Sequence, residues 1–193
     1  MTSDRSRIVV TGMGAMTPLG QTSDAFWANL VAGKPGIGPM TLCDPTDYPC
    51  RIAGEVRDFD PAQYMDNKES RRMARFSQLA VAAGLTAVKS AGLDISREDP
   101  YRVGVVLGNG NGGFPTLEDN CRGLAERGGM RMTPFFFPMV LPNMAAANVS
   151  RFVGAHGYNA TATTACASSN QAIGQALNVI RRGAADVILA GGT

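Results

Sequence analysis

This sequence of 193 residues contains a single histidine, and none of its four cysteines forms a Cys-x-x-Cys pair. The ligand spacings of zinc fingers and zinc ribbons are therefore absent. A disulfide framework is also not expected, because such frameworks are typical of short secreted chains. We therefore expect a reduced, cytoplasmic protein without a metal site. In such a protein, only a cysteine with special surroundings has a chemical role.

An excess of charge of one sign is also missing, since 18 Lys and Arg residues stand against 16 Asp and Glu residues. A nucleic-acid-binding domain needs a strong basic excess or a basic stripe, so we expect no nucleic-acid partner. The longest apolar runs, such as 184–192, are interrupted or too short to span a bilayer, and we expect no membrane association. Hydrophobic residues nevertheless make up 45% of the chain, which is enough for a sizeable core.

Strand-like and helix-like segments alternate along the chain. Apolar runs predict strands at 7–11, 51–56, 103–107, 158–163 and 187–190. Helical spacing of apolar residues predicts helices near 23–31, 68–91, 116–126, 143–152 and 168–182. This alternation indicates one α/β layered domain over residues 1–193, with a mainly parallel sheet and flanking helices.

The end of the sequence carries a further expectation. Residues 187–193 form a buried-looking strand and stop at the turn that follows it. The carboxyl edge of a parallel sheet is where functional loops are built, so natural domains rarely finish there. We therefore expect the chain to be a piece of a longer polypeptide.

The strongest local pattern surrounds Cys166, in the run Thr163-Thr164-Ala165-Cys166-Ala167-Ser168-Ser169-Asn170. A predicted strand enters this run and an amphipathic helix leaves it, as at a nucleophile on a sharp strand-to-helix turn. The helix N-terminus favours thiolate over thiol, and the Cys166 N–H could help to form an oxyanion hole. A buried structural cysteine at a tight junction explains the spacing equally well. Cys43, Cys50 and Cys121 lack this context and are interpreted as structural.

The run Gly108-Asn109-Gly110-Asn111-Gly112-Gly113 fits the dinucleotide-binding pattern G-x-G-x-x-G literally. That interpretation predicts a second strand that ends in Asp or Glu about 20 residues later. Positions 128–132 hold no such strand, so a close backbone approach beside a pocket explains the glycines better.

The single histidine, His156, could in principle pair with Cys166 as a general base. Its place ten residues earlier puts it at the opposite end of the same predicted strand, about 20–30 Å away. We therefore interpret His156 as a turn or surface residue, which leaves Cys166 without a base.

Four cations cluster where the long helix is predicted to begin, namely Lys68, Arg71, Arg72 and Arg75. Cations at a helix N-terminus oppose the macrodipole, so helix stability does not explain them. An acidic partner would explain them. The alternative is a solvated face on which Asp66 and Glu69 pair with the cations.

Several of these motifs together resemble the β-ketoacyl-[acyl-carrier-protein] synthase family, and among its members the synthase II type of fatty-acid elongation. The resemblance is carried by 9–14 with 17–20, by 134–138, by 164–169 and by 183–192. It implies the N-terminal half of a thiolase-like fold built from two similar halves. It also implies a decarboxylative Claisen condensation that needs no cofactor, with Cys166 as the nucleophile that accepts the acyl group.

The same resemblance assigns binding residues and partners. Phe136 would reach across a homodimer interface to line the acyl pocket, and Asn111 would lie near the end of that pocket. The acidic acyl carrier protein would dock on Lys68, Arg71, Arg72 and Arg131. Many relatives carry an apolar residue where this chain has Asn111, so an ordinary long saturated acyl chain is not the expected ligand.

The family's catalytic histidines and lysine lie in a second half that this sequence does not contain, so the 193-residue chain is not expected to decarboxylate malonyl groups by itself. Three alternatives remain. A type II polyketide ketosynthase has the same chemistry, and a non-catalytic acyl-pocket partner subunit typically lacks the cysteine that is present here. A dinucleotide-binding oxidoreductase is disfavoured by the sequence around 128–132.

Overall fold

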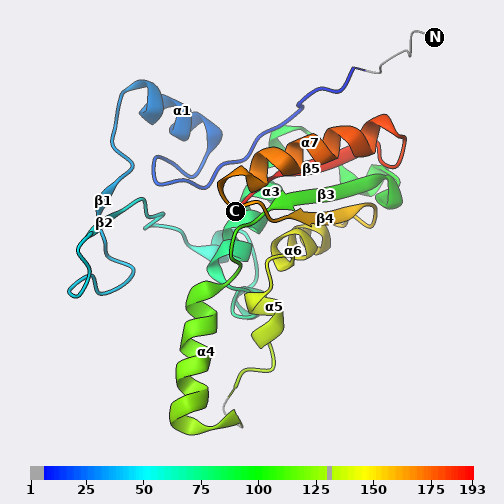
Figure 1. The fold of residues 1–193 in the computed structure, drawn as a ribbon. Coiled ribbons are helices and arrows are strands. Elements are labelled where there is room, and N and C mark those ends of the chain that lie inside the picture. Colours follow the sequence, from blue (N-terminus) through cyan, green and yellow to red (C-terminus); the bar gives the residue numbers. More distant parts are fainter. Residues whose placement is uncertain (1–6, 130–131) are drawn as a thin grey trace.

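A computed structural model describes residues 7–129 and 132–193 (Figure 1). Most predicted elements are present, with boundaries shifted by a few residues. The helices are α1 (Ser23–Val31), α2 (Asn67–Ser70), α3 (Arg75–Ser90), α4 (Phe114–Arg127), α5 (Phe136–Val140), α6 (Met144–Val153) and α7 (Ser168–Arg181). The strands are β1 (Gly38–Pro39), β2 (Ile52–Ala53), β3 (Val103–Gly108), β4 (Asn159–Ala162) and β5 (Val187–Gly192).

The central sheet is parallel and has the strand order β4-β3-β5. Helix α7 covers one face of this sheet, and α3 and α6 cover the other (Figure 1). The layered α/β arrangement predicted from the sequence is therefore confirmed. Within the described residues, no helix combines the length and the hydropathy that crossing a bilayer requires.

The alternation of side chains along β3 explains the two layers. Val105 and Leu107 pack into the core under α3 and α6, whereas Val106 packs into the core under α7. All six residues of β3 are buried, as expected for a strand covered on both faces. On the α7 side, the core contains alanines such as Ala172 and Ala176, whose small side chains let the helix lie close to the sheet.

The amino ends of β3 and β5 are fixed by an ion pair. The Arg102 guanidinium donates to both carboxylate oxygens of Asp186, at 2.9 and 2.5 Å, and also to the Gly183 carbonyl oxygen at 2.7 Å. These hydrogen bonds hold the pKa of Asp186 below its ordinary value. A bidentate pair of this kind sets the register of two strands that are far apart in sequence.

One prediction about the N-terminal region was wrong. Residues 7–11 form no strand, and Val9 and Val10 remain 63% and 82% exposed. A strand needs the hydrogen-bonding groups of a neighbour, and none of the described segments pairs with this one. The chain instead crosses α3 at Gly12, where an added Cβ would lie 2.5 Å from the Ala87 carbonyl oxygen.

The helix predicted at 68–91 is two helices, because the chain breaks between α2 and α3. Ala74 adopts an extended conformation (φ −71°, ψ 160°), and Met73 and Ala74 turn into the core with 3% and 5% of their surface exposed. Arg71 and Arg72 therefore lie in the turn between two helices and not within one helix. The Asp66 carboxylate caps α2 by accepting a hydrogen bond from the Lys68 N–H.

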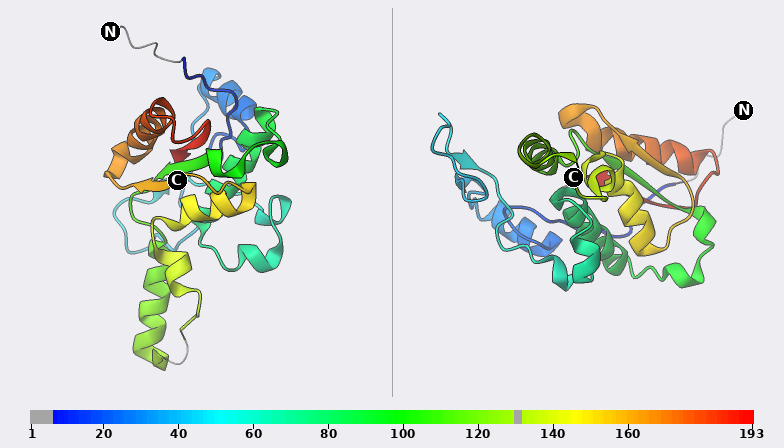
Figure 2. Two further views of the ribbon diagram at one scale, coloured as in Figure 1. Left: turned by 90° about the vertical axis from the view of Figure 1, so that its right-hand side faces the viewer. Right: turned by 90° about the horizontal axis from the view of Figure 1, so that it is seen from below.

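Outside the layered core, β1 and β2 form a short antiparallel hairpin (Figure 2). The Glu55 carboxylate ties it together by accepting hydrogen bonds from the backbone N–H groups of Thr41 and Leu42 and from the Thr41 hydroxyl. It also pairs with Arg57 at 3.2 Å. The backbone N–H of Thr41, followed by that of Leu42, lowers the pKa of Glu55 from 4.5 to about 2.

The hairpin should therefore lose order in acid. Because the folded-state pKa of Glu55 lies below its unfolded value, the contribution of Glu55 to stability is present above about pH 4.5 and is lost as the pH falls towards 2. Glu55→Gln should make amide hydrogen exchange at Thr41 and Leu42 several-fold faster at neutral pH. Glu98→Gln, at an exposed carboxylate, is the control. Unchanged exchange in Glu55→Gln would show that the carboxylate does not hold the hairpin.

Candidate functional site

Cys166 lies at the carboxyl end of the sheet, between β4 and α7. The chain leaves β4 at Ala162, passes through a short 3-10 turn (η5, Ala165–Ala167) and enters α7 at Ser168. Ala165 has a φ of +50°, in the left-handed region that residues with a Cβ rarely adopt. The Cys166 side chain is exposed, so the interpretation of this residue as a buried structural cysteine was wrong.

The turn around Cys166 is closed by four hydrogen bonds. The Ala167 N–H donates to the Thr164 carbonyl at 3.1 Å, and the Ser168 N–H donates to the Ala165 carbonyl. The Ser168 hydroxyl accepts from the Thr164 N–H at 2.8 Å and donates to the Ala165 carbonyl at 2.7 Å. Within the described residues, the Cys166 N–H has no hydrogen-bond partner, so it is available to an oxyanion.

The glycine-rich turn at 109–113 lies beside the cysteine turn. A Cβ at Gly108 would collide with the backbone of Ser168, so only glycine lets β3 end against the start of α7. The Asn109 side chain is buried and bridges two segments. It accepts from the Gly112 N–H at 2.6 Å and donates to the Thr193 carbonyl at 2.8 Å.

The same turn contacts the end of α5, which carries Phe136. The Gly113 N–H donates to the Val140 carbonyl at 3.0 Å, and a Cβ at Gly112 would collide with that carbonyl. The space that a bound phosphate would need is therefore filled by the chain itself, which argues against a dinucleotide site. Asn111 is exposed and Phe136 is half-buried.

The basic cluster divides into two parts. Arg72 pairs with Glu69 at 3.4 Å and stacks over the Phe135 ring, with its guanidinium carbon 4.8 Å from the ring centroid. Glu69 also pairs with Arg151 at 2.6 Å. Lys68 and Arg71 are exposed and form no ion pair within the described residues. The expected pairing of cations with Glu69 is therefore found at Arg72, whereas Asp66 caps α2. Arg131 lies outside the described residues.

His156 lies at the other end of β4, as the sequence predicted. Its backbone N–H donates to the Pro100 carbonyl at 2.8 Å, and its ring packs edge-on against Tyr101, with 5.7 Å between the ring centroids. Within the described residues, Cys166 has no hydrogen-bonded base, and no cluster of His, Cys, Asp or Glu could hold a metal ion.

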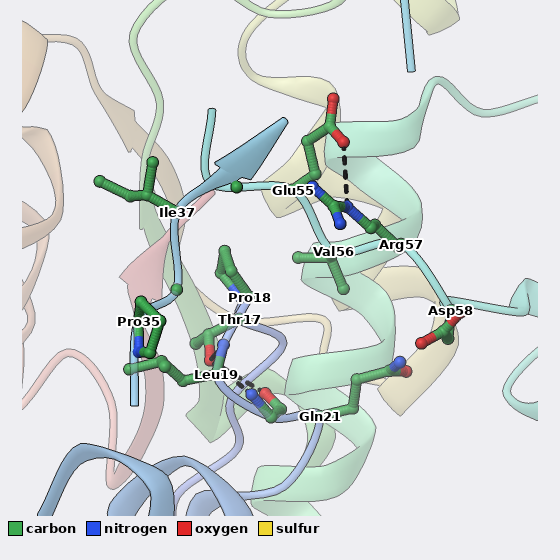
Figure 3. A pocket seen from close by; sticks show the side chains of 13 residues that line it. Thr17, Pro18, Leu19, Gln21, Pro35, Ile37, Glu55, Val56, Arg57 and Asp58 are labelled. Carbon is green, nitrogen blue, oxygen red and sulfur yellow. Dashed lines mark hydrogen bonds and ion pairs between the residues drawn. The ribbon is translucent and has the colours of Figure 1, made fainter. Parts of the chain in front are cut away.

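A separate open cleft lies between the turn at 17–21 and the segment 55–58 (Figure 3). It has a volume of about 380 Å³. Its main charged groups, Glu55 and Arg57, pair with each other. Cys166, Asn111 and Phe136 do not line it, so this cleft belongs to the hairpin and not to the cysteine turn.

Sequence reasoning missed Asn109, Ser168 and Arg151. Asn109 was seen only as part of a glycine pattern, and Ser168 only as a small residue near the cysteine. A signal was present for Asn109, a polar residue next to the buried strand predicted at 103–107, where a polar side chain needs a hydrogen-bond partner. Nothing in the local sequence marks Arg151, which reaches Glu69 across a gap of 82 residues in the chain.

Known proteins share this arrangement. The 3-oxoacyl-[acyl-carrier-protein] synthase 2 of Synechocystis sp. is 42% identical over 190 residues, which cover 98% of this chain and 46% of that protein. A solved ishigamide ketosynthase/chain length factor superposes with a TM-score of 0.89 at 29% identity, covering 97% of this chain and 47% of that chain. A solved type II polyketide synthase acyl-carrier protein in complex with its ketosynthase bound to the hexaketide superposes with a TM-score of 0.84 at 29% identity. The match covers 98% of this chain and 50% of that chain.

These neighbours confirm the thiolase-like architecture expected from the sequence. The chain spans about half the length of the curated relatives it matches. Residues 5–193 match the family model described as "Beta-ketoacyl synthase, N-terminal domain". The resemblance noted from the sequence is thus confirmed over nearly the whole chain, and the protein belongs to the β-ketoacyl synthase family.

Proposed function

We propose that this chain is the N-terminal half of a 3-oxoacyl-[acyl-carrier-protein] synthase of fatty-acid elongation. The observation that carries the proposal is the exposed Cys166, which lies on a tight turn at the start of α7. Its thiolate sulfur would attack the thioester carbonyl of an acyl carrier. The new carbon–sulfur bond forms on Cys166 as the bond between the acyl carbon and the carrier sulfur breaks. The carrier leaves as a thiolate, which takes up the proton that the Cys166 thiol lost.

The backbone of this half supports the acyl-transfer step. The carbonyl oxygen becomes negatively charged in the tetrahedral intermediate, and the unpartnered Cys166 N–H is placed to donate to it. The position at the N-terminus of the 14-residue helix α7 adds a favourable partial positive charge. The groups that assist acyl transfer, namely the Cys166 N–H and the N-terminus of α7, therefore both belong to this chain.

The second step, in which a malonyl carrier loses CO2 and its carbanion attacks the acyl-cysteine, needs groups that handle protons and charge. His156, the one histidine of this sequence, lies at the opposite end of β4 from Cys166. We propose that histidines and a lysine of a second half, as in the family, perform this step.

The proposed partners are an acidic acyl carrier protein and a second copy of the chain. Lys68 and Arg71 are exposed and unpaired within the described residues, and they would dock the carrier together with Arg72 and Arg131. Phe114 and Phe137 are 58% and 65% exposed on the projecting α4 and α5 (Figure 2), which favours a homodimer interface there. The complete protein would be cytoplasmic.

Asn111 favours a second candidate, a type II polyketide ketosynthase. An amide side chain near the end of an acyl pocket is poorly matched to a saturated chain, whereas it can hydrogen-bond to the oxygens of a polyketide. Both solved neighbours described above are ketosynthases with a chain length factor or a polyketide carrier. The two candidates share Cys166 and its chemistry and differ in the acyl group.

The first prediction concerns Cys166. All four cysteines are exposed, so accessibility alone would make them react alike. In the complete protein, Cys166 should react with iodoacetamide at least about tenfold faster than Cys43, Cys50 or Cys121, because only Cys166 lies at the start of a long helix. Peptide mass spectrometry over a time course measures the four rates. Equal rates would remove the nucleophile assignment.

The second prediction concerns carrier docking. Lys68→Glu combined with Arg71→Glu should weaken binding of acyl carrier protein about tenfold at low salt and reduce its salt dependence, since each exposed charge contributes modestly. Titration calorimetry at two salt concentrations measures both effects. Arg97→Glu, at an exposed cation outside the cluster, is the matched control. If the double variant binds like the control, docking does not use this cluster.

The third prediction separates the two candidates. Asn111→Ile should raise kcat/KM for a saturated acyl carrier about tenfold if the pocket of the complete enzyme holds a polar chain, because a buried unpaired amide is costly. A competition assay with saturated and β-keto acyl carriers measures the ratio. A native enzyme that already prefers the saturated chain, with no gain in the variant, would favour fatty-acid elongation.

A further inference from the structure

The backbone next to Cys166 is held in an unfavourable conformation. Ala165 is the one non-glycine residue among those described that has a positive φ, at +50°. For a residue with a Cβ, such a conformation is unfavourable and persists only where surrounding contacts enforce it. The contacts that enforce it determine where the Cys166 side chain points, because Cys166 follows directly.

The Ser168 hydroxyl makes two of the four hydrogen bonds that close this turn. Its oxygen accepts from the Thr164 N–H at 2.8 Å. Its single proton has two candidate acceptors, the Ala165 carbonyl at 2.7 Å and the Asn109 carbonyl at 3.5 Å. The shorter contact takes the proton. One hydroxyl therefore bonds to the residue before Ala165 and to Ala165 itself.

These bonds differ from those of a helix cap. A capping side chain accepts from backbone N–H groups two or three residues further along the helix. Ser168 is the first residue of α7, and its hydroxyl reaches backwards to Thr164 and Ala165, both of which precede the helix. Ser168 is 3% exposed and its backbone lies against the end of β3 at Gly108, so water does not compete for these bonds.

We propose that Ser168 is a positioning residue for Cys166, which acts by holding Ala165 in the left-handed conformation. The proposal rests on the nucleophilic role proposed above for Cys166. Without the hydroxyl, Ala165 relaxes to negative φ, the turn opens, and the sulfur and the Cys166 N–H no longer keep their place at the start of α7.

A double-mutant cycle in the complete protein tests this proposal. Ser168→Ala should lower the rate of Cys166 alkylation by iodoacetamide about tenfold, because the sulfur leaves its position at the start of α7 once the left-handed conformation of Ala165 is no longer held. Ala165→Gly should have little effect alone, because glycine adopts positive φ without cost. In the Ser168→Ala background, Ala165→Gly should restore the rate to within about threefold of the native value.

A matched control is available at Ser77, which is fully buried on α3 and whose hydroxyl has no hydrogen-bond partner among the residues described. Ser77→Ala should leave the alkylation rate unchanged. Thermal unfolding of each variant shows whether the fold is kept. A general loss of structure caused by Ser168→Ala would lower the melting temperature, and Ala165→Gly would not restore the alkylation rate.

Two results would overturn the proposal. One is a native alkylation rate in Ser168→Ala, and the other is a loss that Ala165→Gly does not repair. The proposed function is tested separately by the unmutated protein. If native Cys166 reacts no faster than the other three cysteines, the nucleophile assignment fails and Ser168 has no reactive residue to position.

Discussion

The close contact between the ends of two strands and the start of one helix is the constraint on which the site depends. Gly108 ends β3 against the backbone of Ser168, and Gly192 ends β5 against the Ser169 side chain. A Cβ at either glycine would collide with these atoms, so the helix could not begin where it does. Because α7 begins at this edge, Cys166 lies at the edge and not within the core.

The opposite end of the sheet fixes the alignment that this contact needs. Strands β3 and β5 pair in parallel over six residues, from Val103 opposite Val187 to Gly108 opposite Gly192. The pair between Arg102 and Asp186 lies just before that register begins. A shift of β3 by one residue would place Leu107 or Asn109 where Gly108 is required. The ion pair between Arg102 and Asp186 at the amino ends therefore maintains the strand register that the glycine contacts at the carboxyl ends require.

The sequence was informative where the signal is local. The strands at 103–107 and 187–190 and the helix after Cys166 follow from hydrophobic periodicity and glycine stops, and all three are present. Residues 7–11 have the same apolar composition, but a strand also needs a partner, which composition does not provide. Helical periodicity runs through the break at 71–74, because Met73 continues the apolar face on both sides of it.

The hydrogen bonds of the site could not be predicted from local sequence patterns. Asn109 bonds to Thr193 across 84 residues, and no spacing rule connects two such positions. The basic cluster shows the same limit, since Arg72 was grouped with Lys68 and Arg71 because they are close in sequence. In the folded chain, Glu69 and Phe135 engage Arg72. Arg72 thereby joins the turn before α3 to the segment that carries Phe136. A carrier that binds Lys68 and Arg71 would thus contact a surface that is physically continuous with the proposed acyl pocket.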